Sequence, residues 1–163
     1  LARVAAGAVA KALLAELLPD LSILAWTSRA AGVPAAREGE PGFDETRIEA
    51  DPLRCPDAAA AALMLERITR LREAGDAAGG LVECRVLGAP AGLGSPVFGK
   101  LDAELARAAL SIGGVKAFEL GAGLAAADLL ASEARADPES LAGGIMGGLS
   151  TGAPIRFRVA VKP

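Results

Sequence analysis

The residues best suited to chemistry are glycines and a lysine near the end of the chain. Five glycines fall between residues 143 and 152: Gly143, Gly144, Gly147, Gly148 and Gly152. An alternating segment, 155–161, follows them and ends on Lys162 and Pro163. Because glycine has no Cβ, its backbone turns sharply and lets a flat or charged ligand approach bare N–H groups. The pattern predicts a cradle for a phosphate or a cofactor, with a cation at its edge, and does not specify which ligand.

Several kinds of site are excluded by composition. The chain has no histidine, so it contains no Ser-His-Asp or Cys-His arrangement and lacks the commonest metal ligand. Its two cysteines, Cys55 and Cys84, are far apart and form no C-x-x-C motif, which argues against zinc or dithiol chemistry. We predict ordinary reduced cysteines and no metal site.

Length and charge indicate one domain that binds neither nucleic acid nor membrane. The 163 residues match the usual domain size of roughly 100–200. A net charge of −3 gives no basic field for nucleic acid, though it leaves room for a local basic patch. The longest uncharged apolar runs, 4–10 and 120–127, are shorter than the roughly 20 residues of a membrane span.

The ends of the chain predict a fragment. The sequence starts on Leu1 without a basic region or cleavage motif, so it is not read as a signal peptide. It enters a helical pattern without an N-cap residue, and it stops directly after a strand pattern. We therefore interpret 1–163 as a single partial domain, truncated at both ends.

Helical and strand patterns alternate along the chain. The predicted helices are 3–18, 56–74 and 101–110, and 121–134 is helix-prone but interrupted at Gly123. The predicted strands are 21–30, 81–88, 115–120 and 155–161. The remaining stretches are a polar excursion over the surface at 32–55, anchored by Phe43 and Ile48, an irregular loop at 89–99 and a polar loop at 135–140.

Two helices carry sharper expectations. The first is apolar almost all the way round, which predicts burial on most of its surface and a close backbone approach at Gly7. The second begins with Pro56 at its first position and Asp57 near its positive end, and Gly75 ends it. An apolar stripe and charged residues on the other face complete its amphipathic pattern, with Glu66 and Arg70 spaced to pair.

The strand patterns favour antiparallel sheets. Several strands alternate with a period of two and place charges on one face, as with Glu83 and Arg85, whereas buried parallel strands are apolar throughout. No G-x-G-x-x-G joins a strand to a helix and no P-loop is present, which argues against a Rossmann dinucleotide site.

Four segments in this order resemble chorismate synthase. They are RVAAGAVAKA at 3–12, RCPD at 54–57, GLGSPVFGKLDAELAR at 92–107 followed by LSIGGVK at 110–116, and AGGIMGGLSTG at 142–152 followed by VAVKP at 159–163. The first is similar to the end of the family's R-S-S-A-R-E-T-x-x-R-V-A-A-G-A signature, and the third to its G-L-G-x-P-V-F-x-K-L-D-A-x-L-A segment. Together the matches extend from one end of the chain to the other.

The resemblance implies a fold and a reaction. The family fold is α+β, with helices sandwiched between antiparallel sheets. Its members are lyases of the shikimate pathway. They remove phosphate and a C6 proton from 5-enolpyruvylshikimate 3-phosphate in a 1,4-anti elimination. The reaction requires reduced FMN without net redox change. The resemblance also implies a cytoplasmic homotetramer, and it leaves open whether the flavin is reduced with NADPH by the enzyme itself or by a separate reductase.

The resemblance assigns FMN-binding positions. The loop before a Val-Lys strand corresponds to Gly113 and Gly114, where the family more often has another residue followed by Ala. The second glycine pair of the Gly-Gly-Ile-x-Gly-Gly stretch corresponds to Gly147, which would let the backbone approach the flavin. The Lys-Pro-Thr-Ser-Ser run corresponds to Lys162 and Pro163, with Lys162 as a point charge for the FMN phosphate.

The family's two active-site histidines, its substrate-binding arginines and its Arg-Ser-Ser loop would precede Leu1, and its Thr-Ser-Ser would follow Pro163. The resemblance therefore implies no catalytic residue within this chain, and we predict that the chain alone is inactive. Two alternatives stay open: a non-catalytic flavin-binding or scaffolding paralogue, and a structural α+β domain whose glycine loop has no function.

Overall fold

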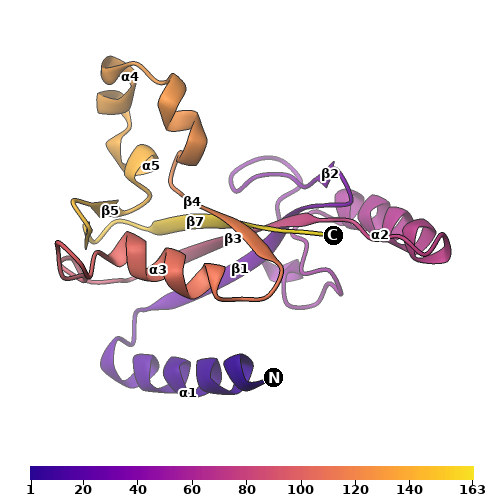
Figure 1. The fold of residues 1–163 in the computed structure, drawn as a ribbon, viewed down its shortest axis with the longest axis horizontal. Helices are drawn as coiled ribbons and strands as arrows, with labels where there is room; N and C mark the ends of the chain where they lie inside the picture. The colour runs from indigo at the N-terminus through magenta and orange to yellow at the C-terminus, as the bar shows by residue number, and fades with distance from the viewer. The chain divides into compact units, whose positions relative to one another are not determined.

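A computed structural model describes residues 1–163, apart from the side chain of Ser140. The α-helices are α1 (Ala2–Leu17), α2 (Ala58–Glu73), α3 (Leu101–Leu110), α4 (Ala131–Ala136) and α5 (Pro138–Ala142), and the 3-10 helices are η1 (Glu45–Arg47) and η2 (Gly123–Asp128). The strands are β1 (Ser22–Ala30), β2 (Val33–Pro34), β3 (Gly80–Leu87), β4 (Val115–Leu120), β5 (Ile145–Met146), β6 (Leu149–Ser150) and β7 (Ile155–Val161) (Figure 1). The predicted helix 101–110 and the predicted strands 115–120 and 155–161 are confirmed with these bounds.

The chain divides into two compact units, each built from three stretches of sequence. Unit 1 consists of residues 1–24, 85–104 and 120–156, and it contains α1 and the glycine-rich segment. Unit 2 consists of residues 25–84, 105–119 and 157–163, and it contains α2 and the end of the chain.

The main sheet has five strands in the order β2-β1-β3-β7-β4, and β5 pairs with β6 in a separate two-stranded sheet. Strands β1 and β2 are antiparallel, with Arg29 opposite Pro34 and Ala30 opposite Val33. The two residues between them, Ala31 and Gly32, have φ of 49° and 77°, as a two-residue hairpin turn requires. Helices together with an antiparallel sheet make the predicted α+β class the observed one.

Within unit 2, neighbouring residues of β4 and β7 face opposite sides of the sheet. The rings of Phe118 and Phe157 lie 5.3 Å apart on one side. The next residue of each strand points the other way, and there Arg158 forms an ion pair with Glu119. The sheet therefore has an aromatic face and a charged face, as the period-two pattern indicates.

Helix α2 begins at Ala58 because Asp57 caps it. The Asp57 Oδ1 atom accepts hydrogen bonds from the N–H groups of Ala59 and Ala60 at 2.9 and 3.0 Å. The prediction that Pro56 takes the first helical position is therefore wrong, since the cap residue lies between Pro56 and the helix. At the other end Gly75 has φ of 70°, which confirms that it ends the helix.

The core of unit 2 lies under α2. Buried residues of α2 pack with others from the preceding segment; the cluster comprises Val33, Cys55, Ala60, Ala61 and Met64. The excursion at 32–55 is anchored as predicted, because the rings of Phe43 and Trp26 meet edge to face at 5.5 Å and Ile48 is completely buried. The same Asp57 carboxylate also accepts a hydrogen bond from the Ala36 N–H at 3.0 Å, so the cap of α2 holds the excursion as well.

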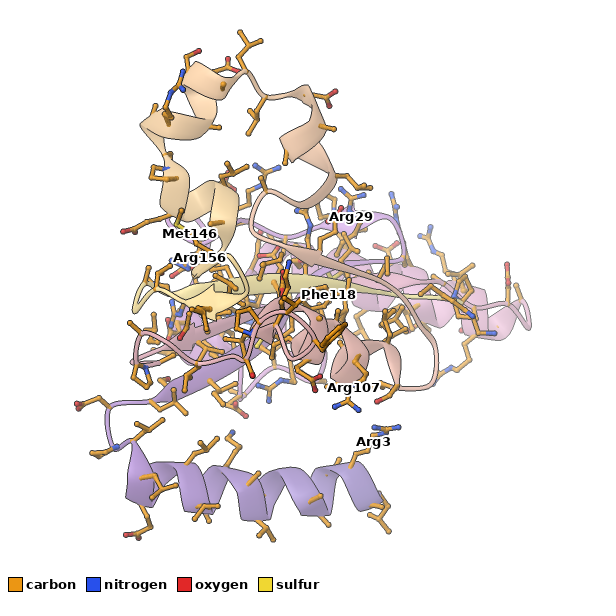
Figure 2. All side chains as sticks on the ribbon, turned by 60° about the vertical axis from the view of Figure 1, so that its left-hand side comes forward. Arg3, Arg29, Arg107, Phe118, Met146 and Arg156 are labelled. Atoms are coloured by element: carbon orange, nitrogen blue, oxygen red, sulfur yellow. The ribbon has the colours of Figure 1, made fainter. Side chains whose placement is uncertain are left out.

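Helix α1 is not buried, which makes the prediction for this helix wrong. None of its residues is buried, and Val4, Val9 and Leu13 are 76%, 72% and 59% exposed. A Cβ added at Gly7 would have no atom within 4 Å, so the expected close approach is also absent. Figure 2 shows side chains of α1 projecting both above and below the helix. The apolar pattern is real, but most of the side chains that form it are exposed.

The segment 121–142 also differs from expectation. The interruption at Gly123 is present, since the residues that follow form the 3-10 helix η2. Residues 135–140, however, are not a polar loop, because α4 extends to Ala136 and α5 begins at Pro138. At the start of α4, the Glu133 carboxylate accepts a hydrogen bond from the Leu130 N–H at 2.7 Å. Helix α5 begins with Pro138, and proline suits the first position of a helix. These local caps start two short helices, of which the predicted helix-prone stretch 121–134 included only the first four residues of α4.

The cap of α2 gives a testable prediction. Replacing Asp57 with Ala should lower the free energy of unfolding by about 1 kcal/mol, measured by urea denaturation. Hydrogen bonds, first of all from the Ala60 N–H, hold the pKa of Asp57 below its ordinary value. The stabilisation is therefore complete above pH of about 4 and is lost as pH falls through the lowered pKa. Asp57→Asn should remove this pH dependence, and Glu73→Ala in the last turn serves as the control.

Candidate functional site

The second glycine pair is the turn of a short β-hairpin. Ile145 lies opposite Ser150 and Met146 opposite Leu149, so only Gly147 and Gly148 join β5 to β6. Their φ values are 60° and 88°, and a two-residue turn with both φ values positive strongly favours glycine. The backbone conformation alone therefore accounts for both glycines, before any ligand is considered.

The two glycines of this turn differ in their surroundings. A Cβ on Gly147 would meet no atom within 4 Å, and Gly147 is exposed. A Cβ on Gly148 would lie 2.5 Å from Cγ of Lys100, and Gly148 is buried. The turn thus has one side packed against the protein and one side open.

The buried side of the hairpin turn rests on the segment before α3. The Gly148 carbonyl accepts a hydrogen bond from the Leu101 N–H at 2.9 Å, at the start of α3. The same carbonyl oxygen would lie 2.3 Å from a Cβ on Gly94, so this position also requires glycine. The G-L-G segment of the sequence is therefore packed against the glycine hairpin.

Ser150 fastens the same two segments together. It is 4% exposed, and its Oγ donates to the Pro90 carbonyl at 2.6 Å and accepts from the Leu93 N–H at 2.8 Å. Its own backbone pairs with the loop as well, through the Gly92 N–H and the Leu93 carbonyl. Three residues of the loop are thus held by a single residue of β6.

The first glycine pair is structural. A Cβ on Gly143 would lie 2.4 Å from the backbone nitrogen of Gly121, and one on Gly144 would lie 2.5 Å from the Pro154 carbonyl oxygen. The Gly143 carbonyl accepts a hydrogen bond from the Arg156 N–H at 3.1 Å. Backbone-to-backbone contact fills the space at both positions, so neither glycine is open to a ligand.

A cavity of about 470 Å³ lies beside the hairpin in unit 1. Residues of α5, of β5 and of the turn after β6 line it, among them Pro138, Gly144, Met146 and Thr151. Figure 2 shows Met146 beside α5. Its size lies in the range of small-molecule sites. Sequence reasoning missed the contribution of α5, because this segment was predicted to be a loop.

Two of the predicted cofactor positions come together in unit 2. The Lys162 N–H donates to the Gly114 carbonyl at 2.9 Å, which joins the loop before β4 to the end of β7. Gly114 has φ of 88°, and a Cβ on Gly113 would meet nothing within 4 Å. Lys162 and Pro163 are exposed. The remaining predicted residue, Gly147, belongs to unit 1.

The thiols are not poised for chemistry. Burial raises the pKa of Cys84 to about 11 and also raises the pKa of Cys55, so neither is a thiolate near neutral pH. Both are free, in agreement with the prediction of reduced cysteines. Among the described residues there is no cluster of three or more acidic or cysteine side chains that could hold a metal ion.

A second hollow, of about 350 Å³, lies on the charged face of the sheet in unit 2. Arg29, Glu119 and Arg158 line it together with one leucine and two alanines. The sequence signal was present only in part, because charges alternate with apolar residues in β7 but not in β1 or β4. What the alternation did not show was that the charges of three strands gather at one place.

Comparison with known proteins identifies the family. The family model described as chorismate synthase matches residues 1–163, the full length of the chain. The chain belongs to the chorismate synthase family. A chorismate synthase of Syntrophobacter fumaroxidans is 48% identical over 169 residues, and one of Opitutus terrae is 44% identical over 173 residues. A crystal structure of chorismate synthase superimposes with a TM-score of 0.85 at 28% identity.

The matches cover the chain and the family members unequally. Each alignment includes 99% of this chain, but only 46% and 47% of the two bacterial sequences and 54% of the solved structure. The chain spans about half the length of the curated relatives it matches. These matches confirm the resemblance and the chorismate synthase-like fold expected from it. Separately, none of the described helices is long and apolar enough to cross a membrane.

The unequal surroundings of the hairpin glycines give a second prediction. Gly147→Ala should cost about 1–2 kcal/mol of unfolding free energy, the usual penalty of a left-handed alanine. Gly148→Ala should cost clearly more, because its methyl group must also displace the Lys100 side chain. Urea denaturation of both variants measures the difference. Equal losses would show that Lys100 moves aside freely.

Proposed function

We propose that the full-length protein containing this chain is an active chorismate synthase. It would eliminate phosphate from 5-enolpyruvylshikimate 3-phosphate and form chorismate, a precursor of the aromatic amino acids. The observation that carries the proposal is the match of the chorismate synthase model to every residue from 1 to 163. Relatives of that name at 44–48% identity support it.

We further propose that the protein uses reduced FMN. When bound, reduced FMN supplies electron density to the substrate as phosphate leaves, with no net redox change. The residues present fit such a group, because Gly147 carries no side chain and the space where a Cβ would stand is open. A planar ring system can approach the backbone of an exposed glycine directly.

We also assign the end of the chain to FMN binding, on the basis of the family resemblance. Lys162 would bind the FMN phosphate as a point charge, and its own N–H is already fixed on the Gly114 carbonyl at 2.9 Å. Gly113 has open space where a side chain would be, so its backbone can meet the cofactor. Pro163 restricts the backbone after the lysine, because its ring fixes φ.

The remaining parts of the proposed protein follow from the family resemblance. The general acids and bases are histidines outside this chain, which itself contains none. We include a homotetramer and a cytoplasmic setting in the proposal. The exposed apolar surface of α1, where Val4 and Val9 are more than 70% exposed, is suited to packing against further parts of the protein or against another subunit.

The phosphate assignment can be tested with a charge-removing variant. Lys162→Met in the full-length protein should weaken FMN binding by about tenfold or more, since a charged hydrogen bond contributes about 1.5–3 kcal/mol. Riboflavin, which lacks the phosphate, should bind both proteins equally. Fluorescence titration measures both affinities. If the variant lost affinity for riboflavin and for FMN equally, Lys162 would not contact the phosphate.

The activity itself gives a further prediction. The 163-residue chain alone should form no chorismate from 5-enolpyruvylshikimate 3-phosphate and reduced FMN, whereas the full-length protein should form it. Reading the coding sequence outward from both ends identifies that protein. A parent without the expected histidines would be a non-catalytic paralogue, and a parent that binds FMN in neither redox state would indicate a purely structural domain.

A further inference from the structure

Lys100 is the residue whose position the proposed function does not explain. It directly precedes α3, and its aliphatic stem lies over the backbone of Gly148. A Cβ on Gly148 would lie 2.9 Å from Cβ, 2.5 Å from Cγ and 3.1 Å from Cδ of Lys100. The stem therefore occupies the space that any side chain at position 148 would need.

This contact determines where the charge lies. Only one methylene separates Cδ from the ammonium group, so the ammonium must lie close to the turn formed by Gly147 and Gly148. The backbone on both sides of the contact is fixed, because the Leu101 N–H donates to the Gly148 carbonyl at 2.9 Å. The first part of the Lys100 side chain, Cβ to Cδ, thus packs against the turn, and the ammonium follows after this contact.

The ammonium of Lys100 has no hydrogen-bond or ion-pair partner among the side chains that the structure describes. The residue is half-buried. The nearby Asp102 turns its carboxylate back to the start of α3, where Oδ1 accepts from the Ala103 N–H at 2.9 Å. A lysine that is packed along its stem and unpaired at its tip is suited to an anionic group supplied by a ligand.

We propose that Lys100 presents its ammonium to the anionic reduced flavin ring bound against Gly147, and thereby favours reduced over oxidised FMN. This inference rests on the proposed function, which places the flavin at Gly147. Reduction gives the ring system a negative charge that the oxidised ring lacks, so a fixed cation beside it acts on one redox state only. The FMN phosphate is assigned to Lys162, which leaves Lys100 for the ring.

The same contact assigns a role to Gly148. Its missing side chain makes room for the lysine stem, whereas Gly147 leaves room for the ligand. The pair would thus combine two different uses of glycine in a single turn. The cation comes from a segment 48 positions away in sequence, in the same unit.

The test compares the affinities of the full-length protein for oxidised FMN and for FMN reduced with dithionite. Lys100→Met should weaken binding of reduced FMN by about tenfold or more, the effect of one charged hydrogen bond, and change binding of oxidised FMN by less than about twofold. Lys100→Arg should keep most of the preference for the reduced form. Lys11→Met, on the exposed surface of α1, removes the same charge elsewhere and should change neither affinity.

Other results overturn the inference in distinguishable ways. If the wild type binds FMN in neither redox state, the proposed function fails and this inference fails with it. If the wild type binds but Lys100→Met loses both redox states equally, while riboflavin binding is unchanged, the cation contacts the phosphate instead. If both affinities are unchanged, Lys100 only packs on Gly148. Circular dichroism checks folding, and Lys100→Gln is the second variant should Lys100→Met misfold.

Discussion

Contact between backbones, without side chains between them, is the constraint on which unit 1 depends. Gly94, Gly143, Gly144 and Gly148 each have backbone or a lysine stem where a Cβ would be, at 2.3–2.5 Å by the shortest distance. Such separations are possible only for glycine. They bring the loop before α3, the hairpin and the segment after β4 together more closely than packed side chains would allow. The geometry at Gly147 and Lys100 is a consequence of this close contact.

Much of the fold could be predicted from the sequence where periodicity is strong and its ends are marked. Helix α3 and strands β4 and β7 have the predicted bounds because glycine or proline flanks each pattern. Helix α5 and the last two residues of α4 were missed, because helices this short do not display a helical period and begin at local caps. The burial of α1 was wrongly predicted because an apolar pattern indicates that a helix needs a partner, not that the partner lies in the same chain.

The candidate site could be predicted only in part. The sequence indicated the glycine stretch and the terminal lysine, and the family resemblance assigned them a cofactor. The sequence could not show that Gly147 has open space where a side chain would be while Gly148 is packed, because both positions have the same residue and similar φ values. Lys100 was missed for a related reason. Nothing in spacing or composition links it to a turn at position 148, and only the fold brings the two together.

The hydrogen bonds of Asp57 determine how unit 2 unfolds locally. One carboxylate oxygen holds the first turn of α2, and the other holds the backbone of Ala36 within the excursion. Neither set of hydrogen bonds can be lost without exposing the same charged group to solvent and weakening the other set. Amide protons at the start of α2 and in the excursion should therefore exchange together, as one cooperative unit. A surface loop of this length would ordinarily fluctuate by itself, but here its mobility is coupled to the fraying of a helix.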